Sequence, residues 1–266
     1  MTWLNRSLRV LATSALLIAL VSVSHAQAPL RIESSATTVA GHTSASDSAR
    51  IIDDRSRGYN YLLEDSDRRY PARWCPGEIF FYVDNTLLAE SDLDPNRELQ
   101  RWVDVFDAWS RASGNAYHFS YRGEQKLVID SNGEPEINSI QPRSIGITYV
   151  HGTKDVGAAD YYAKAVRGRT AGNAGLQVFS SDGPDETALV GDRGFILIDI
   201  DDAENLGANV LRKSLYQHES GHALGLGHVE DQDALMNGTL SRDRRYISDS
   251  DAAGLRKLAT APCTRD

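Results

Sequence analysis

The spacing of apolar and polar residues predicts one mixed domain whose order begins at Trp74. Residues 78–84 are rich in aromatic and β-branched side chains and lie between two turn signals, a pattern typical of a strand. Asp94 and Pro95 then form a good cap and first helical position, and apolar residues recur at helical spacing as far as Gly114. We expect a long amphipathic helix here, packed on a sheet that contains the first strand.

Further apolar runs extend this pattern along the chain. Shorter strands are expected at 117–121, 126–130, 145–150, 175–179 and 194–200. A second helix is expected from about Ala208 to Gly225, and a last helix from Ser248 to about Leu258. Strands, a long helix, more strands and two further helices indicate an α+β domain with a twisted sheet flanked by helices.

The N-terminal stretch has the pattern of a secretory signal peptide, which we expect to span residues 1–26. Arg6 and Arg9 precede an apolar run that is too short and too rich in Ser and Ala for a membrane span. Small residues around Ala26 and Ala28 suit cleavage after either one. This interpretation predicts a secreted or periplasmic protein.

The next segment differs in composition from the rest of the chain. Residues 27–70 are rich in Ser, Thr, Ala, Asp and Arg, and we expect a linker or short pro-segment before a folded domain at 71–266. Loss of the signal peptide would change the formal net charge from −9 to about −11, and no basic run is present, so nucleic acid is excluded as an expected partner. Because no second apolar segment is long enough to cross a bilayer, we expect no stable membrane association. We also expect a monomer.

The chain has two cysteines, Cys75 and Cys263. An exported protein meets an oxidising environment, in which an even pair usually forms a disulfide. We expect one bond that ties the start of the folded region to its end.

The candidate chemistry lies in residues 218–228, HESGHALGLGH. His218 and His222 are four residues apart on the expected helix, so both imidazoles can face one metal ion. A glycine seven residues after His218 can end the helix with a positive φ, which lets His228 fold back as a third ligand. Three protein ligands leave a position for water, as in catalytic zinc sites, with Glu219 beside the metal. The alternative is a set of histidines buried for packing alone, but these three are most of the histidines in the folded part, which favours metal.

This motif resembles that of the metzincin metalloproteases, and within them the sequence is most similar to the matrixins. Ala234-Leu235-Met236 follows the third histidine as the family's Met-turn does, and residues 247–255 resemble the matrixin C-terminal helix. The resemblance implies that Met236 forms an apolar floor under the metal and that Asp251 braces the turn. It also implies a metzincin-like catalytic domain with a mostly parallel sheet and an antiparallel edge strand.

For activity, the resemblance implies a zinc-dependent endopeptidase in which Glu219 is the general base for a zinc-activated water. A peptide or protein substrate would pair with an edge strand, for which residues 175–179 are the best candidate, and a pocket near 236–246 would select side chains. Asn237 and Gly238 depart from the family, because matrixins often have an aromatic residue and a proline there.

The resemblance also bears on further metal sites. Many matrixins hold a structural zinc through several histidines, but only His118 and His151 occur in the middle of this chain, so one zinc is expected. Calcium could bind the acidic group that follows the last expected strand, and the alternative is a solvated acidic turn. The group comprises Asp199, Asp201, Asp202 and Glu204.

Two other function classes stay open at this point. One is a secreted zinc hydrolase that acts on a non-peptide amide, and the other is a binding protein with a vestigial metal site. Glu219 serves the reaction rather than the metal, so its presence argues against a vestigial site. The string nearest to the family's cysteine latency motif is RWCPG at 73–77, where Cys263 offers Cys75 a simpler partner.

Overall fold

The computed structural model describes residues 31–34, 37–38, 58–62, 71–153, 161–168, 170–180, 189–206, 209–261 and 263. The expected signal peptide at 1–26 lies outside the described residues, as does most of the segment 27–70.

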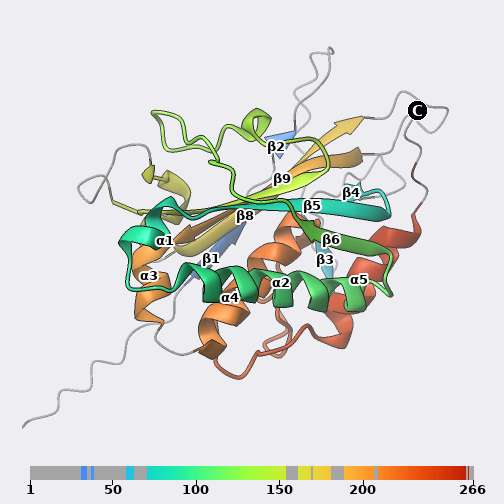
Figure 1. Ribbon diagram of the computed structural model, residues 1–266. Coiled ribbons are helices and arrows are strands. Elements are labelled where there is room, and N and C mark those ends of the chain that lie inside the picture. The colour runs from blue at the N-terminus through green and yellow to red at the C-terminus, as the bar shows by residue number, and fades with distance from the viewer. Residues whose placement is uncertain are drawn as a thin grey trace, which may run out of the picture.

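The described residues form one layer of sheet and one layer of helices (Figure 1). Eight strands make the main sheet, whose path runs in the order β1-β8-β9-β7-β5-β6, with β2 beside β8 and β4 beside β9. β8 is antiparallel to β9, and every other pairing in this sheet is parallel. The expected mostly parallel sheet with an antiparallel strand is confirmed, but this strand, β8, lies between β9 and β1 and is not at the edge as expected. The strands are β1 (Arg31–Ser34), β2 (Thr37–Thr38), β4 (Arg73–Trp74), β5 (Gly77–Asp84), β6 (Tyr117–Tyr121), β7 (Ser144–Val150), β8 (Thr170–Ser180) and β9 (Leu189–Asp199).

Three longer helices lie on the same side of the sheet (Figure 1). They are α2 (Pro95–Ala112), α4 (Asn209–Ala223) and α5 (Asp249–Thr260), and the shorter helices are α1 (Thr86–Glu90) and α3 (Ile200–Asn205). α2 begins as expected, because the Asp94 carboxylate accepts hydrogen bonds from two backbone N–H groups in the first turn. The three helices expected from the sequence are confirmed, whereas α1 and α3 gave no clear signal.

The sheet separates two apolar clusters, and β9 shows this best. Ile196 and Ile198 belong to the main cluster, which the helices cover, while Phe195 and Leu197 belong to a second cluster. Successive side chains of a strand point to opposite faces, so this alternation places one cluster on each face. The second cluster also includes Ile137 of the short 3₁₀ helix η2 (Ile137–Ser139).

The strand expected at 126–130 is wrong. Ile129 forms only an isolated bridge, and its partner is Pro135. Two backbone hydrogen bonds flank this bridge, from the N–H of Asp130 to the carbonyl of Glu134 and from the N–H of Glu136 to that of Val128, at 2.8 Å each. The Asp130 carboxylate then accepts backbone hydrogen bonds from two and four residues later, at 2.8 and 2.9 Å, which closes a tight turn. The other expected strands are confirmed, and those at 175–179 and 194–200 are parts of a longer β8–β9 hairpin.

A second, two-stranded sheet joins β3 (Asn60–Tyr61) to β10 (Leu226–Gly227) in antiparallel pairing. The side chain of Tyr61 is 1% exposed and lies in the main cluster. No pattern in the sequence predicted β3, which lies within the segment 27–70. This short sheet fixes the chain directly after α4, where the third histidine of the motif follows.

Cys75 and Cys263 form the expected disulfide, with their Cα atoms 5.5 Å apart and a separation of 188 positions along the chain. No described cysteine is free, so Cys75 has no thiol to offer as a latency ligand.

We expect the double variant C75S/C263S to unfold with a free energy about 2–4 kcal/mol lower than that of the parent chain, because the bond restricts the unfolded ensemble over a long loop. Equilibrium denaturation in urea measures this difference. The parent chain under reducing agent is the matched control, since it should lose a similar amount without any substitution. An unchanged midpoint in the double variant would contradict the expectation.

Candidate metal centre

Three histidine side chains converge where α4 ends. His218 and His222 lie one turn apart on α4, and His228 follows β10. Nε2 of His228 is 3.2 Å from Nε2 of His218 and 3.1 Å from Nε2 of His222. A tetrahedral zinc ion with Zn–N distances of about 2.0–2.1 Å holds its nitrogen ligands about 3.3 Å apart. The three side chains therefore fit one zinc ion.

Backbone carbonyls fix the tautomers of two of these rings. Nδ1 of His218 is 2.7 Å from the carbonyl oxygen of Leu235, and Nδ1 of His222 is 2.7 Å from that of Leu226. A carbonyl oxygen only accepts, so Nδ1 donates its proton and Nε2 keeps a free lone pair. In both rings it is Nε2 that faces His228, as a metal ligand requires.

Burial keeps all three rings neutral. It lowers the pKa of His218 to about 3 and that of His228 to about 4, and it lowers the pKa of His222 well below its ordinary value. Neutral imidazole is the form that binds a metal. The site is therefore ready for a cation across the neutral pH range.

The turn after α4 depends on glycine. Gly225 has a φ of +105°, and a methyl group added there would lie 3.0 Å from the carbonyl oxygen of Ala72. Its backbone N–H donates to the carbonyl of His222 at 2.9 Å, which closes the last turn of the helix. The expected sharp turn at Gly225 is confirmed, and it returns the chain so that His228 meets the other two histidines.

Glu219 is fully buried next to this histidine cluster, with an exposed fraction of 0%. Neither carboxylate oxygen has a hydrogen-bond partner among the described residues. Burial raises the pKa of Glu219 well above its ordinary value. A buried carboxyl without a partner beside three metal-ready histidines is typical of a group kept for chemistry rather than for stability.

A glycine of β8, which sequence reasoning missed, makes room for this carboxyl. A methyl group added at Gly172 would lie 2.7 Å from Oε1 of Glu219, so only glycine fits. The signal available in the sequence was a glycine inside a strand, which often marks a close approach. Its partner lies 47 positions away, and no pattern in the sequence pointed to it.

Met236 lies where an apolar floor was expected. Its side chain is buried, and a methyl group added at Gly221 of α4 would collide with its sulfur atom. The Asp251 carboxylate accepts hydrogen bonds from the N–H groups of Leu235 at 2.9 Å and Met236 at 3.4 Å. It also accepts from the N–H and hydroxyl of Ser248 at 3.0 and 2.6 Å, which completes a capping box on α5. Asp251 thus holds the turn that presents the Leu235 carbonyl to the metal centre.

Asn237, which departs from the family pattern, has its own role in the turn. Its side-chain amide lies 3.2–3.3 Å from the carbonyl oxygens of three consecutive residues, 229–231. These residues directly follow His228, so the amide ties the third histidine's segment to the Met-turn.

Two indole groups hold α4 from outside the motif. Nε1 of Trp74 donates to the carbonyl oxygen of Ala223 at 2.8 Å, and Nε1 of Trp109 donates to that of Gln217 at 3.0 Å. Both indoles are fully buried. The helix that carries two of the histidines is thus anchored at both ends of the metal-binding turn by β4 and α2.

The four acidic residues considered for calcium have other contacts. Oδ1 of Asp199 accepts from the N–H groups of Asp201 and Asp202 at 3.0 and 3.3 Å and so caps α3. Oε1 of Glu204 accepts from the N–H of Asp92 at 2.9 Å. Within the described ranges, the histidine cluster is the only group of three or more such side chains close enough to hold a metal. Calcium stays a prediction.

The strand expected to receive a substrate has a neighbour on its outer edge. β1 pairs with β8 in parallel from Arg31 opposite Thr170, and β2 continues this pairing as far as Thr38 opposite Val178. The chain's own residues therefore lie along the edge that passes Gly172 and the buried Glu219.

A sequence model of the matrixin family matches residues 145–260. The chain is matrixin-like. The matched segment runs from β7 to α5 and includes the histidine cluster, the Met-turn and Asp251. This matrixin-like segment supports a zinc metallopeptidase in general, and the mixed sheet and helices are consistent with a matrixin catalytic domain. No curated protein matches the chain.

Proposed function

We propose that this matrixin-like chain is a secreted zinc-dependent endopeptidase in which Glu219 is the general base. The observation that carries the proposal is the buried Glu219 carboxyl, which has no hydrogen-bond partner and lies one residue from a member of a three-histidine cluster. The signal-peptide pattern and the disulfide between Cys75 and Cys263 support export to an oxidising compartment. None of the helices in the described ranges has the length and apolarity needed to cross a bilayer.

His218, His222 and His228 would hold the zinc through Nε2, and a bound zinc would supply a more acidic water and a polarised carbonyl. Glu219 would accept the proton lost by the attacking water, because its carboxylate has no competing partner. The protonated Glu219 would then donate that proton to the departing amine.

The test is internal cleavage of an unbiased peptide library by the purified chain with zinc, read by mass spectrometry. We expect cleavage that a chelator abolishes and that added zinc restores. Bound zinc without any cleavage would favour a non-peptide amide hydrolase or a binding protein with a vestigial site. A screen of amide substrates other than peptides would then separate those two.

Deleting residues 1–57, which removes β1 and β2 but keeps β3, should lower KM severalfold with little change in kcat. The pairing of 31–34 and 37–38 with β8 occupies backbone groups that an extended peptide would use, and removing a competitor raises the fraction of binding-competent protein. Initial rates over a range of peptide concentrations measure both constants. A chain that lacks only residues 1–26 is the matched control, and equal KM values for the two chains would contradict the expectation.

A further inference from the structure

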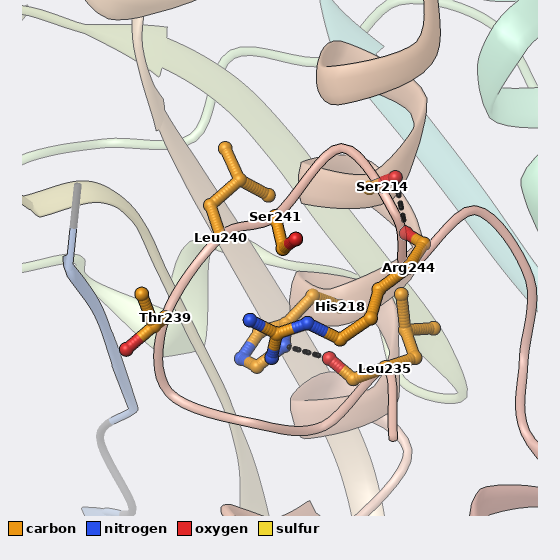
Figure 2. Close-up of a pocket in the computed structure, with 7 residues that line it drawn as sticks. All are labelled: Ser214, His218, Leu235, Thr239, Leu240, Ser241 and Arg244. Carbon is orange, nitrogen blue, oxygen red and sulfur yellow. Dashed lines mark hydrogen bonds between the residues drawn. The ribbon is translucent and has the colours of Figure 1, made fainter. Parts of the chain in front are cut away.

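A small pocket adjoins the metal centre, because His218 of the histidine cluster is one of its lining residues (Figure 2). Ser214 and His218 of α4 line it together with Leu235, and the loop that follows contributes Thr239, Leu240, Ser241 and Arg244. The pocket is narrow and partly open to solvent. His218 belongs to the histidine cluster. A substrate side chain that entered this pocket would therefore belong to a residue next to the scissile bond.

An arginine lies across this pocket. Figure 2 shows the guanidinium of Arg244 beside the imidazole of His218, and its charge contributes to the lowered pKa of that histidine. The hydroxyl of Ser214 donates to the backbone carbonyl of Arg244 at 2.6 Å, which fixes the main chain at this wall. The backbone of Arg244 is therefore held in place at the pocket.

The Arg244 guanidinium is not satisfied by its surroundings. Nε and Nη1 are buried and have no hydrogen-bond partner among the described residues. Asp231, Asp233 and Asp243 act on it only at longer range, and the Asp251 carboxylate already serves the Met-turn. Burial lowers the pKa of Arg244 below its ordinary value, but a guanidinium keeps its proton in proteins. Two buried donors of a half-buried positive charge thus have no partner at this wall of the pocket.

We propose that Arg244 selects an acidic side chain in the residue that adjoins the scissile bond, so that the preferred substrates are peptides cut next to Asp or Glu. This inference rests on the proposed endopeptidase function. A carboxylate can accept a charge-assisted hydrogen bond from Nε or from Nη1 of this guanidinium. An apolar side chain would leave both buried N–H groups without a partner, which is the more costly outcome.

The remaining lining agrees with a polar occupant. Ser214, Thr239 and Ser241 bring hydroxyl groups to the pocket, against the two apolar residues Leu235 and Leu240. A site built to satisfy a charge rejects an uncharged analogue of the same shape because its own donors are then left without partners. We expect kcat/KM for an aspartate peptide to exceed that for the matching asparagine peptide by about tenfold or more.

The test uses the full chain with zinc and peptides that differ only in Asp, Asn, Leu or Lys beside the scissile bond. The parent chain should prefer Asp over Asn, Arg244→Gln should bring that ratio close to one, and Arg244→Glu should shift the preference to Lys. Arg245→Gln is the matched control, because this neighbouring arginine is exposed and does not line the pocket. It should keep the ratio of the parent chain.

A binding measurement keeps the inference testable without turnover. In the Glu219→Gln background, fluorescence anisotropy should show about tenfold tighter binding of the Asp peptide than of the Asn peptide, and adding Arg244→Gln should remove the difference. Cleavage without an acidic preference, or a preference that survives Arg244→Gln, would overturn the inference and leave the endopeptidase function intact. Loss of all cleavage in the parent chain would count against the function itself, and equal binding of the two peptides would count against the role of Arg244.

Discussion

Replacing Glu219 with glutamine should lower kcat for peptide cleavage by about 1,000-fold or more and leave the zinc content unchanged. Glutamine matches the shape of glutamate but cannot accept a proton, and a positioned acid or base contributes about 100- to 10,000-fold to a rate. The three histidines do not depend on Glu219 for any hydrogen bond, so the metal should stay bound. Rates on one peptide, together with metal analysis of the same sample, measure both quantities.

The matched control for this variant is Glu230→Gln, an exposed glutamate that follows the third histidine. It should retain the activity of the parent chain. If Glu219→Gln cleaves peptides at a rate within tenfold of the parent chain, Glu219 is not the base, and another group must take the proton.

Asp251→Ala should lower the free energy of unfolding by about 3–5 kcal/mol and weaken zinc binding by about 10- to 100-fold. The substitution leaves the N–H groups of Leu235, Met236 and Ser248 without their buried acceptor. The same turn presents the Leu235 carbonyl that orients His218, so loosening it also loosens a metal ligand. Equilibrium unfolding and competition with a zinc chelator measure the two effects.

Asp249→Ala is the control for general damage to α5, since Asp249 lies in the same first turn but is exposed. Its effect on stability should stay within about 1 kcal/mol. If Asp251→Ala is as stable as Asp249→Ala, the turn is held by other contacts, and the brace inferred from the hydrogen bonds is wrong.

The histidine cluster could be predicted because its geometry is local. A spacing of four residues places two side chains on one face of a helix whatever surrounds it, and Gly225 marks the turn that returns His228 to them. The disulfide could be predicted from the number of cysteines and the expectation of an oxidising compartment, since only one pairing was available. These inferences needed no knowledge of how distant segments pack.

The features that sequence reasoning missed depend on segments far apart in the chain. Gly172 makes room for Glu219, yet nothing in either local pattern points to the other. Arg244 lies in a stretch without periodicity, so its place beside His218 follows only from the course of the loop after the Met-turn. β1 carries no strong strand signal because its pairing with β8 supplies order that its composition does not.

The strand expected at 126–130 does not form, for a different reason. Its residues have strand propensity, and Leu127 and Ile129 are buried as strand residues often are. The tight turn at residues 130–134 decides the outcome, because it returns the chain after a single bridge between Ile129 and Pro135. Propensity therefore predicted the burial correctly but not the length of the paired segment.

The two indoles that anchor α4 show that the functional unit extends beyond the segment that matches the family. The family match covers 145–260, but Trp74 and Trp109, which bind the carbonyls of Ala223 and Gln217, lie before it. The recognisable stretch is therefore smaller than the piece that must be passed on intact for the histidines to keep their places. A recombination event or an expression boundary at residue 145 would separate the histidine motif from the tryptophans that hold its helix in place.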